Sequence, residues 1–145
     1  MGPLENHAAL VRTKMVEEAF AKPDCQVEIV EKQVANWNRV QAQDLVTSWM
    51  TAGLEFDAIV ANNDEMAIGA IQAIEEAGLK PGKDILVVSI DGVRGAFEAM
   101  MQGKLNVTVE CNPLLGPQLI QTAQAVKAGQ PVAKRIVVQE GVFPA

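Results

Sequence analysis

The sequence predicts an α/β fold: a doubly wound parallel sheet flanked by helices, with its first strand missing. Two observations predict this fold class. Helical segments of about 10 to 19 residues alternate with short apolar runs, which is the pattern of successive βαβ units. The chain also opens on a helical segment, where that order requires a strand. We therefore interpret the chain as a fragment that lacks the strand preceding its first helix.

The helices are recognised by apolar periodicity and by the residues that end them. They are predicted at about residues 4–22, 40–51, 64–77, 95–102 and 114–127. Pro23 ends the first, because proline cannot continue a helix. Gly53 and Gly78 close the second and third as C-terminal caps. Asp91-Gly92 forms the turn before the short fourth helix, and Pro113 separates the last helix from the strand before it.

The strands are short apolar runs between these helices. They are predicted at about residues 26–34, 57–61, 85–90, 105–111 and 135–139. The first alternates apolar and polar residues, which indicates a strand near a sheet edge. The second and third are nearly continuous apolar runs, typical of strands buried on both faces of a parallel sheet.

A run of polar residues, Asn62-Asn63-Asp64, joins the second predicted strand to the following helix. These residue types are good helix N-caps. The run also lies at the carboxyl end of a strand, where open α/β sheets bind ligands. Capping and ligand binding are equally supported by the residues alone.

Composition excludes several classes of function. With 145 residues, of which 49% are hydrophobic and 21% charged, the chain has the size and composition of one globular domain. A net charge of −6 disfavours a nucleic-acid partner. No signal-peptide pattern opens the chain, and no apolar run reaches the ~18 residues of a membrane span. Cys25 and Cys111 have no metal-binding spacing and His7 stands alone, so we expect neither metal nor cofactor.

The chain resembles the C-terminal lobe of a type I periplasmic sugar-binding protein, in the ribose, inositol and rhizopine branch of ABC-transporter receptors. The matching stretches are Gly2-Pro3-Leu4, Arg12-Thr13-Lys14, Ala35-Asn36-Trp37-Asn38-Arg39, residues 62–70 (Asn-Asn-Asp-Glu-Met-Ala-Ile-Gly-Ala), Ser89-Ile90-Asp91-Gly92 and residues 105–113. The resemblance implies three parts. Residues 1–111 would form the sugar-binding lobe without its first strand, residues 112–139 would pack on an absent N-terminal lobe, and residues 140–145 would begin a truncated return strand.

The resemblance also implies a set of ligand-binding residues. Trp37 matches the aromatic residue that packs on the sugar ring, although a core tryptophan is the alternative. Asn63 matches the cleft asparagine and Asp91 the aspartate that accepts hydrogen bonds from sugar hydroxyls. Either could instead serve only its local turn. Of Arg12 and Lys14, we prefer Arg12 as the ligand-facing residue, because a guanidinium group can bind two hydroxyls at once.

The sequence departs from the family at one position of the site. Cys111 stands where the family commonly has a glutamine, and a thiol is a poor partner for a hydroxyl. Glu110 or Asn112 could replace it, or the pocket could be smaller on this side.

The favoured function is therefore a non-catalytic solute receptor of an ABC importer, which would deliver a monosaccharide or cyclitol to a membrane permease. The resemblance implies a periplasmic protein or an extracellular lipoprotein. The alternative is the effector domain of a LacI-type sugar-responsive repressor. An enzyme is disfavoured, because the chain has no phosphate-binding glycine run and no nucleophile elbow.

A lobe without its neighbours would expose apolar surface and a vacant strand position. Both features favour association, so we expect the isolated chain to dimerise or to exchange a segment with a second copy.

Overall fold

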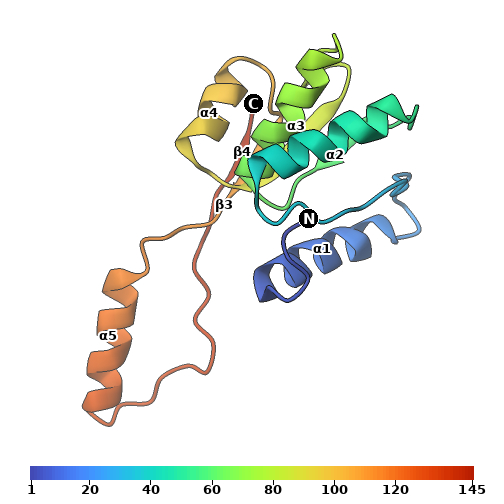
Figure 1. The fold of residues 1–145 in the computed structure, drawn as a ribbon. Coiled ribbons are helices and arrows are strands. Elements are labelled where there is room, and N and C mark those ends of the chain that lie inside the picture. Colours follow the sequence, from blue (N-terminus) through green and yellow to red (C-terminus); the bar gives the residue numbers. More distant parts are fainter.

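A computed structural model describes residues 1–145 as five helices and one four-stranded sheet. The elements in chain order are α1 (His7–Phe20), α2 (Arg39–Thr51), β1 (Ala58–Val60), α3 (Asp64–Glu76), β2 (Leu86–Asp91), α4 (Arg94–Met101), β3 (Val107–Glu110), α5 (Gly116–Lys127) and β4 (Val142–Pro144). Figure 1 shows a body formed by the sheet with α2, α3 and α4, while α5 lies well apart from it. The predicted fold class, a mainly parallel sheet flanked by helices, is confirmed.

The sheet has the order β1-β2-β3-β4. β1, β2 and β3 are parallel, and β4 is antiparallel to β3. In the middle of the sheet Val88 of β2 lies opposite Val60 on one side and Val107 on the other. The parallel arrangement brings the carboxyl ends of β1, β2 and β3 to one edge of the sheet.

The hydrophobic core lies between the sheet and helices α2 and α3. Its fully buried members include Ile74 of α3, Val87 of β2 and Leu105. Much of the rest is alanine, which allows α2 and α3 to approach closely. At the closest point Gly69 of α3 faces the backbone of α2. A Cβ atom at this position would lie 2.1 Å from the carbonyl oxygen of Arg39.

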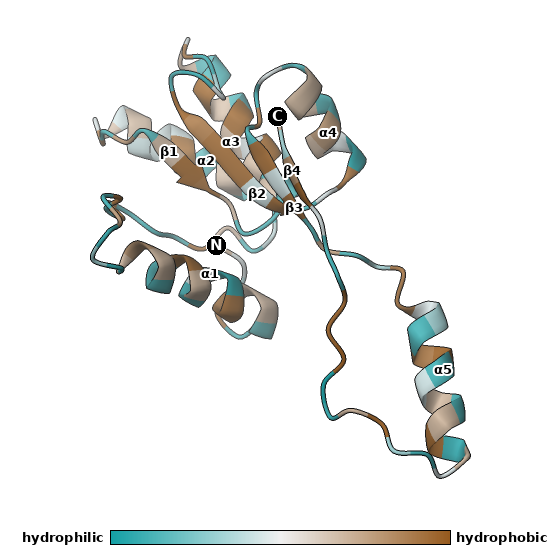
Figure 2. Ribbon diagram, turned by 180° about the vertical axis from the view of Figure 1, so that it is seen from behind, coloured by the Kyte–Doolittle hydropathy of each residue, from teal (hydrophilic) through white to brown (hydrophobic).

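Two helices are poorly integrated into this core. Ala9 is the only buried residue of α1, and α5 has none. Figure 2 shows α5 and the extended segment after it projecting from the sheet, with hydrophobic residues along both. No helix in the structure combines the length and the hydropathy that a bilayer crossing requires.

The strand predicted at residues 26–34 is wrong. This segment is extended but belongs to no sheet, and its Val27 and Val30 side chains are each 51% exposed. The alternating pattern is present, yet strand structure also requires a neighbour for the backbone hydrogen bonds. The edge of β1 that faces this segment is unpaired, so the two backbones do not form a ladder.

The strand predicted at residues 135–139 is also wrong. Those residues are extended and unpaired, with Val137 71% exposed. The last strand forms later, where Thr108 of β3 pairs with Phe143. The ring of Phe143 packs edge-on against Phe97 of α4, with centroids 5.2 Å apart. The contact between Phe97 and Phe143 therefore stabilises the last strand at a position that the apolar periodicity did not identify.

The close approach of α2 and α3 generates the first prediction. Gly69→Ala should lower the free energy of unfolding by about 1–3 kcal/mol, because the added methyl group meets backbone that must move. Gly116→Ala is the control, since nothing lies within 4 Å of a Cβ atom at that position of α5. Urea unfolding followed by circular dichroism measures both. Equal stability of the two variants would contradict the close contact.

Candidate ligand-binding site

Three of the residues predicted for ligand binding meet at the carboxyl edge of the sheet. Arg12 of α1 forms an ion pair with Asp91 at the end of β2, with Nη1 3.0 Å from Oδ1. The Arg12 guanidinium carbon also lies 5.6 Å from the centre of the Trp37 ring, in a cation–π arrangement. A cation, a carboxylate and an aromatic plane thus form one cluster from three separate parts of the chain.

The loop before α2 positions Trp37. Asn36 and Trp37 have positive φ angles of 50° and 59°, so the chain turns sharply here. Asn38 fixes the exit from the turn, because its side chain accepts a hydrogen bond from the N–H of Gln41 and caps α2. One part of the indole rests on Gly2, where a Cβ atom would lie 2.3 Å from the ring. Trp37 is therefore half-buried and held in place.

Asn62 and Asn63 have different roles. The Asn62 side-chain oxygen accepts hydrogen bonds from the Gly2 N–H and the Thr13 hydroxyl, each at 3.1 Å. Its backbone oxygen accepts from Arg12 Nη1 at 2.6 Å. Asn62 thus attaches α1 and the first residues of the chain to β1. Asn63 caps α3 by accepting from the N–H of Met66 at 3.0 Å.

Asp64 was not predicted as part of the site, yet it organises it. Its carboxylate is fully buried and accepts hydrogen bonds from the hydroxyls of Ser89 on β2 and Thr108 on β3. The other carboxylate oxygen accepts from the backbone N–H groups of Gly92 and Val93, both at 2.8 Å. One side chain therefore connects three consecutive strand ends. The sequence indicated capping or ligand binding for the run that contains Asp64, but not this network, because the hydrogen-bond partners are distant in the chain.

Asp91 adopts an unusual backbone conformation with φ of 142°, which is strained for a residue with a side chain. The strain is held in place by the hydrogen bonds of Asp64 to the next two residues and by the carbonyl of Asp91 itself, which accepts from the N–H of Cys111 at 2.9 Å. The backbone thus directs the Asp91 carboxylate toward Arg12.

The electrostatics of Asp91 combine opposing effects. Burial raises the pKa of Asp91 above its ordinary value of 3.8, while the charge and hydrogen bond of Arg12 oppose this shift. The nearby negative charges of Asp64 and Glu65 raise the pKa further. The Arg12 ion pair therefore offsets only part of the effect of burial on this carboxylate.

The residues around Cys111 lie at the end of β3. The Glu110 carboxylate accepts a hydrogen bond from the Gly141 N–H at 2.9 Å, and the Asn112 side chain accepts from the Leu114 N–H at 2.8 Å. Both side chains thus support the chain path toward α5 and β4. Cys111 is exposed, and it and Cys25 are both free thiols. The only hydrogen bond between these three residues and the Arg12–Trp37–Asp91 cluster is the backbone one from the Cys111 N–H to the Asp91 carbonyl, and none of their side chains bonds to the cluster.

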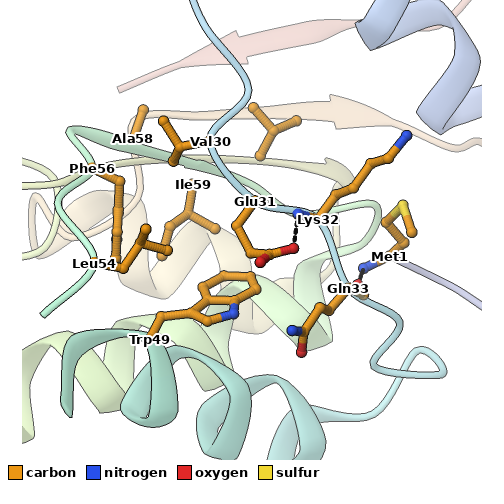
Figure 3. A pocket seen from close by; sticks show the side chains of 11 residues that line it. Met1, Val30, Glu31, Lys32, Gln33, Trp49, Leu54, Phe56, Ala58 and Ile59 are labelled. Carbon is orange, nitrogen blue, oxygen red and sulfur yellow. Dashed lines mark hydrogen bonds between the residues drawn. The ribbon is translucent and has the colours of Figure 1, made fainter. Parts of the chain in front are cut away.

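The main hollows of the surface lie beside β1 rather than at this cluster. A groove of about 700 Å³ runs between α1, the extended residues 26–32 and β1, and it reaches Asn62 at one end. A smaller hollow of about 110 Å³ lies on the α2 side of β1 (Figure 3). No group of three or more His, Cys, Asp or Glu side chains is arranged to hold a metal ion.

The fold and the cluster at its carboxyl edge define one lobe of a binding protein. Residues 1–131 match the periplasmic binding protein domain, and the chain belongs to that family. A protein named for rhizopine binding, from Rhizobium meliloti, is 43% identical over 140 residues, which cover 95% of this chain and 45% of that protein. The galactofuranose-binding protein of Escherichia coli K12 is 42% identical over 80% of this chain and 37% of its own length.

A solved structure gives the same result for the fold. The solute-binding protein of an ABC transporter from Bacillus halodurans C-125, with bound myo-inositol, is 33% identical and superposes with a TM-score of 0.85. The match covers 99% of this chain and 49% of that protein. The chain thus spans about half the length of the relatives it matches.

Asp64 generates the second prediction. Asp64→Ala should lower the free energy of unfolding by about 2–4 kcal/mol, because four donors lose a charged acceptor in a buried position. Asp44→Ala, an exposed aspartate on α2 whose side chain makes no hydrogen bond, is the control. Urea unfolding measures both variants. A loss no greater than that of the control would show that the network contributes little.

Asp91 generates the third prediction. The pKa of Asp91 is higher in the folded chain than its ordinary value of 3.8. Between these two pKa values the native state binds more protons than the unfolded state, so the free energy of unfolding falls as the pH rises from the lower to the higher. Asp91→Asn cannot ionise, so it should lose less stability than the parent between about pH 4 and pH 7. Urea unfolding at both pH values tests this, with Asp44→Asn as the control. An identical pH dependence in parent and Asp91→Asn would refute it.

Proposed function

We propose that this chain forms one wall of the ligand site in a solute-binding receptor for a monosaccharide or cyclitol. The observation that carries the proposal is the cluster of Arg12, Asp91 and Trp37 at the carboxyl edge of the sheet. In the intact receptor the bound solute would pass to the membrane permease of an ABC importer. The names of the relatives, which refer to rhizopine, galactofuranose and myo-inositol, support this class of ligand.

The chemistry of the cluster suits a neutral polyol. The Asp91 carboxylate can accept hydrogen bonds from two adjacent hydroxyls, and such charge-assisted bonds are stronger than neutral ones. Arg12 uses Nη1 on Asp91 and on the Asn62 carbonyl, while its other N–H groups remain available as donors. Trp37 supplies an apolar plane for the C–H face of a sugar or cyclitol ring. Asn63 Nδ2 donates to no group within the chain, so we propose it as a further donor to the ligand.

Receptors built of two lobes hold the ligand between them and close by a hinge motion. This chain would then supply only half of the contacts and leave the other face of the ligand in water. We therefore expect binding by the chain alone to be no tighter than millimolar. Glu110, Cys111 and Asn112, at the end of β3, remain candidates for contacts made only when the second lobe is present.

The repressor alternative would use the same cluster for an effector, so the ligand-binding residues do not separate it from a receptor. The receptor is favoured because the relatives with more than 40% identity carry the names of binding proteins. We propose a binding function without catalysis, in a protein located, like its family, in the periplasm.

The fourth prediction uses the two tryptophans as internal probe and control. In a two-dimensional NMR titration of the ¹⁵N-labelled chain with myo-inositol to high millimolar concentration, the indole N–H signal of Trp37 should shift. The signal of Trp49 should not, because Trp49 belongs to the hollow on the α2 side of β1. Equal shifts of both signals would indicate a non-specific effect of the solute.

The fifth prediction concerns a complete two-lobed protein, made by replacing the matching half of the myo-inositol-binding relative with this chain. Asp91→Ala in that chimaera should weaken binding by about 1.5–3 kcal/mol, the value typical of a hydrogen bond to a charged group. Calorimetric titration with myo-inositol, ribose and galactose measures it, with Asp44→Ala as the control. A folded chimaera in which Asp91→Ala leaves affinity unchanged would exclude Asp91 from the site.

A further inference from the structure

Asn62 is buried beside the Arg12–Trp37–Asp91 cluster and lies at a fixed point of the sheet edge. It is only 4% exposed and follows shortly after β1. The N–H of the residue before it, Ala61, continues the ladder by donating to the Val88 carbonyl at 2.9 Å. The residue after it, Asn63, caps α3. Because both neighbours are tied to secondary structure, Asn62 cannot move without the sheet.

The polar contacts of α1 with the sheet edge converge on Asn62. Ala9 is the only buried residue of α1, so apolar packing contributes little to the position of this helix. Arg12 donates from Nη1 to the Asn62 backbone oxygen at 2.6 Å, and the Thr13 hydroxyl donates to Asn62 Oδ1 at 3.1 Å. The side-chain oxygen of Asn62 therefore holds the turn of α1 from which Arg12 reaches Asp91.

The same oxygen supports the aromatic member of the cluster. Asn62 Oδ1 also accepts a hydrogen bond from the Gly2 N–H at 3.1 Å. A Cβ atom on Gly2 would lie 2.3, 2.5 and 2.6 Å from three consecutive carbons of the Trp37 six-membered ring. Three such similar distances occur only above the face of a ring, so the indole rests face-on against Gly2. Asn62 thus fixes the backbone that supports Trp37.

We propose that Asn62 is a positioning residue of the ligand site, which acts on the ligand only through Arg12 and Trp37. The inference rests on the proposed function of that cluster. Groups that are ordered before the ligand arrives lose less freedom on binding, so the bound state costs less free energy. The two adjacent asparagines then differ in role, because Asn63 is proposed to contact the ligand itself.

The effect of Asn62 on Arg12 can be measured in the chain without ligand. The charge and the hydrogen bond of Arg12 lower the pKa of Asp91, so displacement of Arg12 should raise that pKa. Thr13→Val, which removes only the hydroxyl donated to Asn62, should therefore raise the pKa of Asp91 above that of the parent. Thr13→Ser keeps the hydroxyl and should restore the parent pKa. Carbon-13 NMR of the side-chain carboxyl groups in a pH titration measures it.

Two further variants test whether Asn62 acts through Arg12. Asn62→Leu and Arg12→Gln should each raise the pKa of Asp91, and their combination should raise it no further than Arg12→Gln alone. Thr51→Val is the control, because the exposed Thr51 hydroxyl donates only to a carbonyl of its own helix. Circular dichroism establishes that each variant is folded. Thr13→Val decides the question if Asn62→Leu does not fold.

NMR titration with myo-inositol tests the consequence for the ligand. The initial slope of the Trp37 indole shift should be about threefold lower in Thr13→Val and Asn62→Leu than in the parent, the effect of losing roughly one net hydrogen bond. Thr13→Ser should respond as the parent does.

An unchanged Asp91 pKa in folded Thr13→Val and Asn62→Leu would overturn the proposal. So would an additive effect in the double variant, or an undiminished response to myo-inositol in these variants. A parent chain that does not respond to myo-inositol would contradict the proposed function instead, and the Asp91 pKa then still decides whether Asn62 orients Arg12.

Discussion

The carboxyl edge of the sheet depends on the hydrogen bonds that the Asp64 carboxylate accepts. It lies at the start of α3, directly after β1, and accepts hydrogen bonds from β2, from β3 and from the turn before α4. Burying a charge is unfavourable unless donors surround it, and here four donors do. These hydrogen bonds therefore hold α3, β2, β3 and the turn before α4 together at the edge where Asp91 lies. Asp91, which we propose contacts the ligand, is strained and partly exposed, while the neighbouring Asp64 is buried and carries the structural hydrogen bonds.

The sequence was sufficient for features governed by local patterning. The helices, the three parallel strands and the cap at Asn63 were predicted from the residues, while the resemblance to the sugar-binding family assigned Arg12, Trp37 and Asp91 to one site. It was insufficient where structure depends on a distant partner. Residues 26–34 and 135–139 have strand patterns without a strand neighbour, and the last strand forms at Val142–Pro144, where Phe143 contacts Phe97. The hydrogen-bond network of Asp64 was missed for the same reason, since Ser89 and Thr108 are 25 and 44 residues away.

The chain divides into a well-packed body and parts that lack partners. The core between α2, α3 and the sheet is dense enough for a glycine to be required at the helix contact. By contrast, α5 buries no residue, and the free edge of β1 is apolar. Surfaces of this kind are rare on monomeric proteins and mark places where other protein surface belongs.

The attachment of α1 to the sheet depends on charged side chains. Polar contacts attach the middle of this helix to the sheet edge, through Arg12 and Thr13 to Asn62 and Asp91, while Val16 and Phe20 further along border the open groove. Two ion pairs, Arg12–Asp91 and Glu17–Lys32, thus contribute to the attachment of α1, and neither is fully buried. Salt screens partly exposed ion pairs, so the attachment of α1 should weaken as the ionic strength rises, and a ligand that contacts Arg12 or Asp91 would act on the same attachment.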